Sequence, residues 1–107
     1  MIDEQDFRRA AELALDSLKR HLIELEEEDN AGFEVEEQNG ALNVLFEEPP
    51  GKFVITPNTP VRQIWISALS TSFKLDWDAV NSDFILPRTK EPLVPLVDRL
   101  IHERQEG

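Results

Sequence analysis

The sequence of 107 residues contains no cysteine, and this absence removes several kinds of chemistry at once. Without cysteine the chain forms no disulfide, no thiolate nucleophile and no cysteine-ligated metal centre of its own. It also lacks an apolar run close to the about 18 residues that a membrane span requires, and its N-terminus shows no signal-peptide or transit-peptide features. We therefore expect a soluble, cytoplasmic protein with no membrane contact.

Basic residues are also scarce, with 11 Lys and Arg against 22 Asp and Glu, for a net charge of −11. Nucleic-acid binding needs Lys or Arg at each phosphate contact, so we expect no nucleic-acid partner. The hydroxyl-rich segment 67–72 has no nearby histidine base, and the isolated glycines form no phosphate-binding motif. The sequence predicts no enzyme active site.

Apolar residues make up 40% of the chain and recur with clear periods, which predicts a single globular domain over residues 1–107. Asp3 is a plausible N-cap for a first helix of roughly residues 3–28. Its apolar stripe, at steps of three and four, is Phe7, Ala11, Ala14, Leu18, Leu22 and Leu25. Helical spacing returns from Leu93 to Ile101, which predicts a second helix at the end of the chain.

Between the two helices the apolar period changes to two, as expected for strands. Residues 33–46 alternate around Asn39-Gly40, a strong hairpin signal. Further strands are predicted at 52–56, 61–67, about 73–77 and 83–86. We expect an α+β fold, a two-layer α/β sandwich in which two helices pack on one face of a five- to six-stranded antiparallel sheet.

The net negative charge is confined to one part of the sequence. Residues 1–48 hold fifteen acids and four bases, whereas residues 49–107 hold seven of each. The centre of the excess is Glu24, Glu26, Glu27, Glu28, Asp29, Glu34, Glu36 and Glu37. Four of these acids close the first helix, where the helix dipole disfavours negative charge, so we interpret them as a binding site for a cation rather than a device for solubility.

Strand parity predicts an unusual position for a tryptophan. If Ile64 and Ile66 face the helices, Trp65 points to the opposite, uncovered face of the sheet. Trp65 is then expected to be exposed, and an exposed Trp among mixed polar and apolar residues is typical of a protein-binding surface. The alternative is a bulge that shifts the parity by one residue and buries Trp65 in the core.

Three segments in this order resemble the frataxin family: Phe53-Val54-Ile55-Thr56-Pro57-Asn58-Thr59-Pro60, then Arg62-Gln63-Ile64-Trp65-Ile66-Ser67, then Leu75-Asp76-Trp77. The likeness extends over nearly the whole chain, including the acidic first helix and the Asn39-Gly40 hairpin, and the bacterial branch fits best. The resemblance implies weak binding of iron, as Fe(II) or Fe(III), by an acidic ridge. It also implies a role in iron–sulfur cluster assembly, as an iron donor (iron chaperone) or regulator that contacts the cysteine desulfurase and the scaffold protein.

Carried over to this sequence, the resemblance implies an iron ridge made of Asp16, Glu24, Glu26, Glu27, Glu28, Asp29, Glu34 and Glu36. It implies a partner-binding surface made of Thr56, Asn58, Gln63, Trp65 and Lys74. The sequence departs from the family pattern at Lys19-Arg20, where relatives tend to carry acids, and at Thr56, which is often Asn.

Carboxylates alone predict a shallow, unselective site that also accepts other divalent cations. Three alternatives stay open: a ferroxidase activity, an acidic protein-binding module with no metal role, and oligomers bridged by metal instead of a monomer. His21 is expected at the boundary of the core, and Asp98, His102 and Glu106 are expected to be surface residues, although their spacing on one helix face is also compatible with a metal site.

Overall fold

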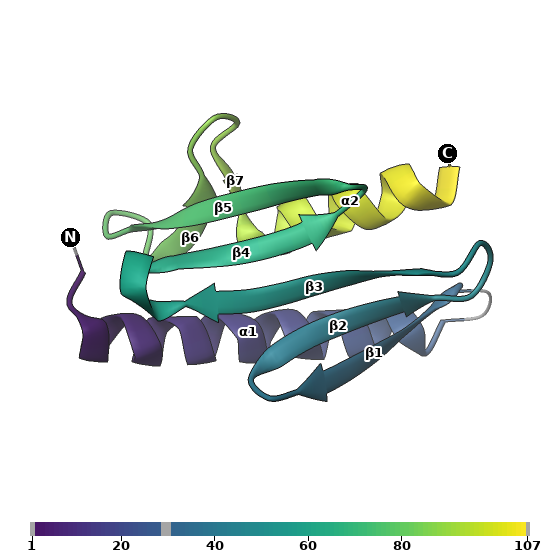
Figure 1. Cartoon of the computed structure of the whole chain (residues 1–107), viewed down its shortest axis with the longest axis horizontal. Helices are drawn as coiled ribbons and strands as arrows, with labels where there is room; N and C mark the ends of the chain where they lie inside the picture. The colour runs from purple at the N-terminus through teal and green to yellow at the C-terminus, as the bar shows by residue number, and fades with distance from the viewer. Residues whose placement is uncertain (1, 29–30, 107) are drawn as a thin grey trace.

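Two helices cover one side of a single antiparallel sheet in the computed structural model, which describes residues 2–28 and 31–106. Figure 1 shows both helices behind the strands, so the molecule has two layers and the other face of the sheet is turned to the viewer. In chain order the elements are α1 (Glu4–Glu26), β1 (Phe33–Gln38), β2 (Ala41–Phe46), β3 (Gly51–Asn58), η1 (Thr59–Val61), β4 (Gln63–Ala68), β5 (Thr71–Asp78), β6 (Asp83–Leu86), β7 (Glu91–Pro92) and α2 (Leu93–Glu106). The predicted two-layer sandwich is confirmed.

The strands pair in sequence order from β1 to β7, every neighbour antiparallel. Asn39 and Gly40 connect β1 to β2 with φ angles of 52° and 81°, as a two-residue hairpin turn requires. The sheet has seven strands where five or six were predicted. The additional strand is β7, and its two residues are too few, with one of them proline, to produce an alternating pattern.

The first helix begins where the sequence predicts, because the side chain of Asp3 accepts a hydrogen bond of 2.8 Å from the backbone N–H of Asp6. It ends at Glu26, two residues before the predicted end. Residues 59–61, which include part of the predicted fourth strand, form a short 3₁₀ turn instead of extended chain, since Pro60 favours such a turn.

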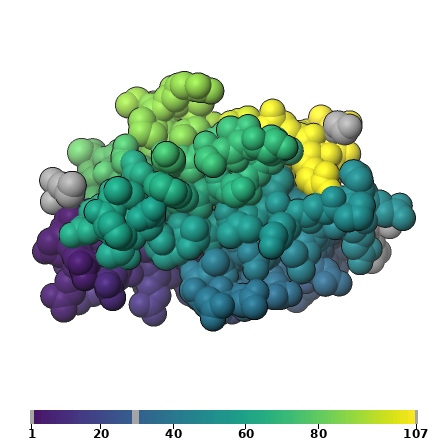
Figure 2. Space-filling view, in the orientation of Figure 1, coloured from purple at the N-terminus to yellow at the C-terminus, as the bar shows by residue number. Residues whose placement is uncertain are grey.

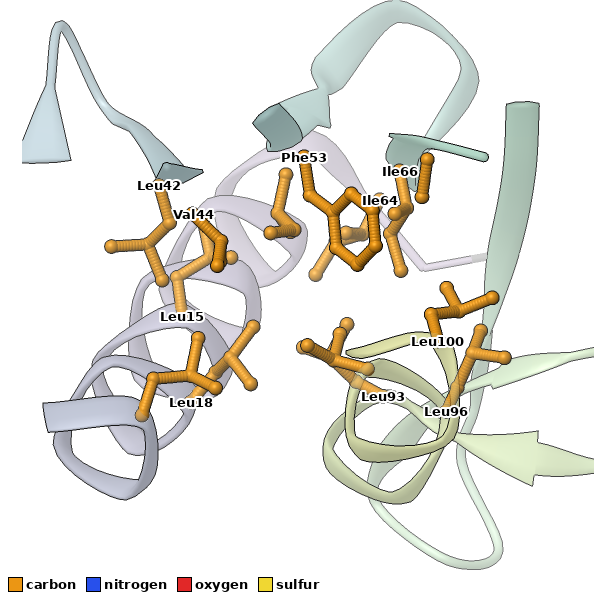
Figure 3. Packing of buried hydrophobic residues seen from close by; sticks show 14 of the residues in the cluster. Leu15, Leu18, Leu42, Val44, Phe53, Ile64, Ile66, Leu93, Leu96 and Leu100 are labelled. Atoms are coloured by element: carbon orange, nitrogen blue, oxygen red, sulfur yellow. The ribbon is translucent and has the colours of Figure 1, made fainter. Parts of the chain in front are cut away.

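The core lies between the helices and the sheet. Figure 3 shows leucines of α1 and α2, among them Leu18 and Leu96, pointing toward strand residues such as Val44 and Ile64. The buried residues of α1 are Phe7, Ala11, Leu15, Leu18 and Leu22. The predicted stripe therefore holds except that Leu15 replaces Ala14 at a buried position, while Ala14 and Leu25 are half-buried at its margin.

The predicted parity of the central strands is confirmed. Ile64 and Ile66 have no exposed surface, and Trp65 between them lies on the opposite face, where it is half-buried instead of exposed as predicted. No bulge interrupts the pairing of β4 with β3 or β5. We call this second face, which no helix of the described chain covers, the open face; it is the surface turned to the viewer in Figure 2.

Candidate functional site

One edge of the molecule combines the acids of α1 with those of β1. Figure 1 shows the C-terminal half of α1 lying behind β1 and β2, and β1 is the edge strand. Side chains join the two elements: Lys19 Nζ lies 3.1 Å from Glu37 Oε1, and the N–H of Val35 lies 3.4 Å from Glu26 Oε2. The fold thus brings together two acidic segments that are separate in the sequence.

We call this surface the acidic edge; its described residues are Glu24, Glu26, Glu27, Glu28, Glu34, Glu36 and Glu37. Asp29, which the sequence places in the same group, lies outside the described residues. Alternation along β1 divides the strand's acids. Glu34 and Glu36 are exposed on the open face, whereas Glu37 turns toward Lys19 of α1. The acidic edge therefore carries carboxylates on both sides of β1.

Basic residues compensate only part of this charge. Asp16 pairs with Arg20 one turn further along α1, and Glu37 pairs with Lys19. Within the described ranges, no ion pair involves Glu24, Glu27, Glu28, Glu34 or Glu36, and the last turn of α1 contains no basic residue. The carbonyl end of the helix adds its own partial negative charge at the same place, so a cation is favoured there.

The acidic edge does not form a closed metal site. Across residues 2–28 and 31–106, no group of three or more His, Asp or Glu side chains is arranged to hold an ion. Its carboxylates have the oxygen donors that hard cations prefer, but all of them except the half-buried Glu26 are exposed to water. The arrangement suits weak, exchangeable binding and not a fixed metal centre.

A second surface lies on the open face, where the five predicted partner-binding residues form two rows across neighbouring strands. The first row aligns Thr56, Trp65 and Lys74, and the second aligns Asn58 with Gln63. We call this surface the tryptophan patch. Lys74 is exposed, and its Nζ lies 4.7 Å from the centre of the Trp65 ring, within the range of a cation–π interaction.

The second row continues to Asp76 of β5, which the list of predicted partner-binding residues omits. Parity alone places Asp76 on the open face, but only the register of β4 against β5 shows that it lies opposite Gln63. That register depends on the turn at Leu69 and Ser70, whose φ angles of 53° and 60° occur without glycine or asparagine. The sequence therefore gives no local signal for this turn.

His21 and Asp98 join the two helices. His21 Nε2 lies 2.8 Å from Asp98 Oδ1, and both side chains are partly buried. His102 pairs separately with Glu106 on the surface of α2, at 3.1 Å. Asp98, His102 and Glu106 therefore do not converge on one point, and His21 lies at the boundary of the core as predicted.

Two acids with lowered pKa values, Asp78 and Glu91, lie outside both surfaces. The side chain of Asn81 and two backbone N–H groups hold the pKa of Asp78 below its usual range in the turn after β5. Hydrogen bonds from Arg99 lower the pKa of Glu91, where β7 meets α2. In both cases the lowered pKa follows from local hydrogen bonds, and structural contacts of this kind shift a pKa without a catalytic role.

The fold defines a small domain of the two-layer α/β sandwich class. A family model described as the frataxin-like domain matches residues 1–107. The chain belongs to this family, as the sequence resemblance predicted. No helix of the described chain is long and apolar enough to cross a membrane.

Individual relatives agree with this membership. The chain is 26% identical over 90 residues to the iron-sulfur cluster assembly protein CyaY of Pseudomonas entomophila, a match that covers 84% of this chain and 81% of the relative. CyaY of Pseudomonas aeruginosa is also 26% identical, with 84% and 82% covered. The name that these relatives share describes iron–sulfur cluster assembly.

The fold is also that of a solved frataxin. The structure of frataxin from Psychromonas ingrahamii superposes with a TM-score of 0.75 at 21% sequence identity, covering 99% of this chain and 94% of that one. Because the sequence identity is low, this likeness supports the architecture, and the binding surfaces have to be argued from their own geometry.

Proposed function

We propose that the chain is an iron-binding protein of iron–sulfur cluster assembly, acting as an iron donor to the complex of cysteine desulfurase and scaffold protein or as its regulator. The name of its relatives supports the process. The main observation in support of this proposal is that two surfaces are separate. The acidic edge, the proposed iron site, lies on α1 and β1, whereas the tryptophan patch, the proposed docking surface, lies on β3 to β5.

In this proposal the acidic edge holds iron loosely. Fe(III), and Fe(II) less strongly, accept carboxylate oxygens. The candidate ligands are six acids of the acidic edge, Glu24, Glu26, Glu27, Glu28, Glu34 and Glu36, together with Asp29 and with Asp16, which pairs with Arg20. Exposed carboxylates are screened by salt, and ordering long Glu side chains opposes binding, so affinity is low and other divalent cations compete. Low affinity suits a protein that must release its cargo.

The tryptophan patch is the proposed contact with the assembly proteins, through Thr56, Asn58, Gln63, Trp65 and Lys74. Trp side chains contribute much of the binding energy in many interfaces, because a large apolar ring is removed from water while the N–H keeps a hydrogen bond. Here the Trp65 N–H already has a partner, since its Nε1 donates to Gln63 Oε1 over 2.8 Å. The ring can therefore be buried by a partner without leaving its N–H unsatisfied.

A second candidate function is an acidic protein-binding module with no metal role. It is favoured by the absence, in the part of the chain that the structure describes, of any convergent group of three metal-binding side chains. In that function the acidic edge meets a basic surface of a partner directly.

Two variants separate these functions. Glu27 and Glu28 are exposed at the end of α1, and we expect E27K/E28K to lose most anaerobic Fe(II) binding in equilibrium dialysis. We expect Trp65→Ala to keep iron binding and to weaken docking on purified cysteine desulfurase by about 2 kcal/mol, or about thirtyfold in Kd. E4K/E12K, with the same charge change in the first half of α1, is the matched control.

The outcomes are distinct. Unchanged iron binding by E27K/E28K contradicts the metal role. A loss of docking by E27K/E28K in metal-free buffer, beyond that of E4K/E12K, supports the module without metal. Unchanged docking by Trp65→Ala contradicts the assignment of the tryptophan patch.

A further inference from the structure

A chain of hydrogen bonds on the open face ends at Asp76. Trp65 Nε1 donates to Gln63 Oε1 over 2.8 Å, and Gln63 Nε2 donates to Asp76 Oδ1 over 2.8 Å. The backbone register supports this order, because Gln63 lies directly opposite Asp76 in the pairing of β4 with β5. Lys74, directly opposite Trp65, places its Nζ over the ring.

The chemistry of the two ends fixes the orientation of the middle residue. An indole N–H can only donate a hydrogen bond, and an ionised carboxylate can only accept one. A glutamine amide has one end of each kind, so only one of its two orientations satisfies both neighbours. Asp76 thus holds the NH₂ of Gln63 toward itself and turns the carbonyl of Gln63 toward Trp65.

The geometry points to Asp76 as a positioning residue for docking: through Gln63 it fixes the Trp65 indole in the orientation that the partner binds. This inference rests on the proposed function for its partner, the cysteine desulfurase. Fixing the ring before binding removes part of the entropy cost of ordering it at the interface. Asp76 acts on Trp65 indirectly, because its carboxylate contacts Gln63 and not the indole.

Three substitutions at residue 76 give different expectations. In D76A the amide of Gln63 loses the partner that orients it, and Trp65 becomes mobile. In D76N the side-chain oxygen can still accept a hydrogen bond from Gln63, so the chain of hydrogen bonds is largely kept. In D76K the introduced ammonium group is a donor, so the Gln63 amide should reverse and turn its NH₂ group toward the indole N–H. The chain of hydrogen bonds is then broken most completely.

The direct readout is the indole N–H signal of Trp65 in the chain of 107 residues by ¹H–¹⁵N NMR, assigned with a W65F variant. We expect D76A to speed solvent exchange of this proton about threefold or more, because its acceptor is no longer held in place. The indole signal of Trp77, which lies on β5 next to Asp76 but on the opposite face of the sheet, should change little. The melting temperature should also change little. E12A, which removes an exposed acid from α1, is the matched control and should change neither indole.

Docking on cysteine desulfurase gives the second readout. We expect D76A to raise Kd about threefold to tenfold, the range of one hydrogen bond, and D76N to stay near the wild-type value. Because Asp76 acts on Trp65 through Gln63, D76A should have almost no further effect on Kd in a Q63A background. The effects of the two substitutions on docking should therefore be strongly non-additive.

Three results would overturn the inference: an unchanged Trp65 indole signal in D76A, a D76N variant as impaired as D76A, or full additivity of D76A with Q63A. A failure of the proposed function has a different signature. In that case W65A docks normally while the indole signal still responds to D76A.

Discussion

Arg99 of α2 holds Glu91 of β7 with two hydrogen bonds, from Nε at 2.6 Å to one carboxylate oxygen and from Nη2 at 2.9 Å to the other. A third bond, from Nη1, reaches Glu103 one turn further along α2 at 2.8 Å. This two-point contact is the main reason why the pKa of Glu91 lies below its usual range, and the hydroxyl of Thr89 adds to it. It joins the shortest strand of the sheet to the middle of the second helix.

The depressed pKa predicts how stability depends on pH. Glu91 is ionised more readily in the folded chain than in the unfolded chain, so its contribution is present above the unfolded pKa and is lost as pH falls through the folded value. Replacing Arg99 with Gln should lower the free energy of unfolding at pH 7 by about 0.5 to 1 kcal/mol, a modest value because Arg99 is substantially exposed to water. The two proteins should converge in stability between about pH 5 and pH 3.

Urea unfolding across this pH range measures the effect. R88Q is the control, since Arg88 is an exposed base near β7 with no ion pair among the described residues. A constant difference between wild type and R99Q from pH 7 to pH 3 would show that the contact with Glu91 contributes nothing through its charge.

Two leucines on α1 test the orientation of this helix. Leu18 has no exposed surface and belongs to the core, whereas Leu13 is 63% exposed. We expect Leu18→Ala to lower the free energy of unfolding by about 2 to 5 kcal/mol, because it leaves a cavity, and Leu13→Ala to change it by less than about 0.5 kcal/mol. Urea unfolding of both variants compares the same chemical change in the same helix. Similar losses for the two would contradict the assigned face.

Much of the fold follows from local sequence signals. Asp3 marks the start of the first helix and Asn39-Gly40 marks the first hairpin, because each residue type satisfies a specific demand of the backbone. The strand β7 and the turn at Leu69 and Ser70 were missed for the opposite reason. Two residues have no period, and positive φ angles at leucine and serine are imposed by the paired strands on either side and not by local preference.

The candidate surfaces were likewise predicted only in part from the sequence. Charge confined to residues 1–48 predicts the acidic edge, and strand parity predicts that Trp65 leaves the core. Neither signal reveals how side chains pair across elements. The contact of Lys19 with Glu37 and the link from Gln63 to Asp76 depend on strand register and on the packing of α1 against β1, which only the three-dimensional structure gives.

The central claim is that iron binds at the acidic edge and that docking uses a separate surface, the tryptophan patch. An anaerobic two-dimensional amide NMR titration with Fe(II), repeated with Ca(II) or Mg(II) as a control for general carboxylate binding, tests it most directly. The account predicts iron effects confined to about residues 16–37, with signals of Trp65 and its neighbours unchanged. No iron-dependent change at millimolar metal, or changes centred on Trp65, would contradict it.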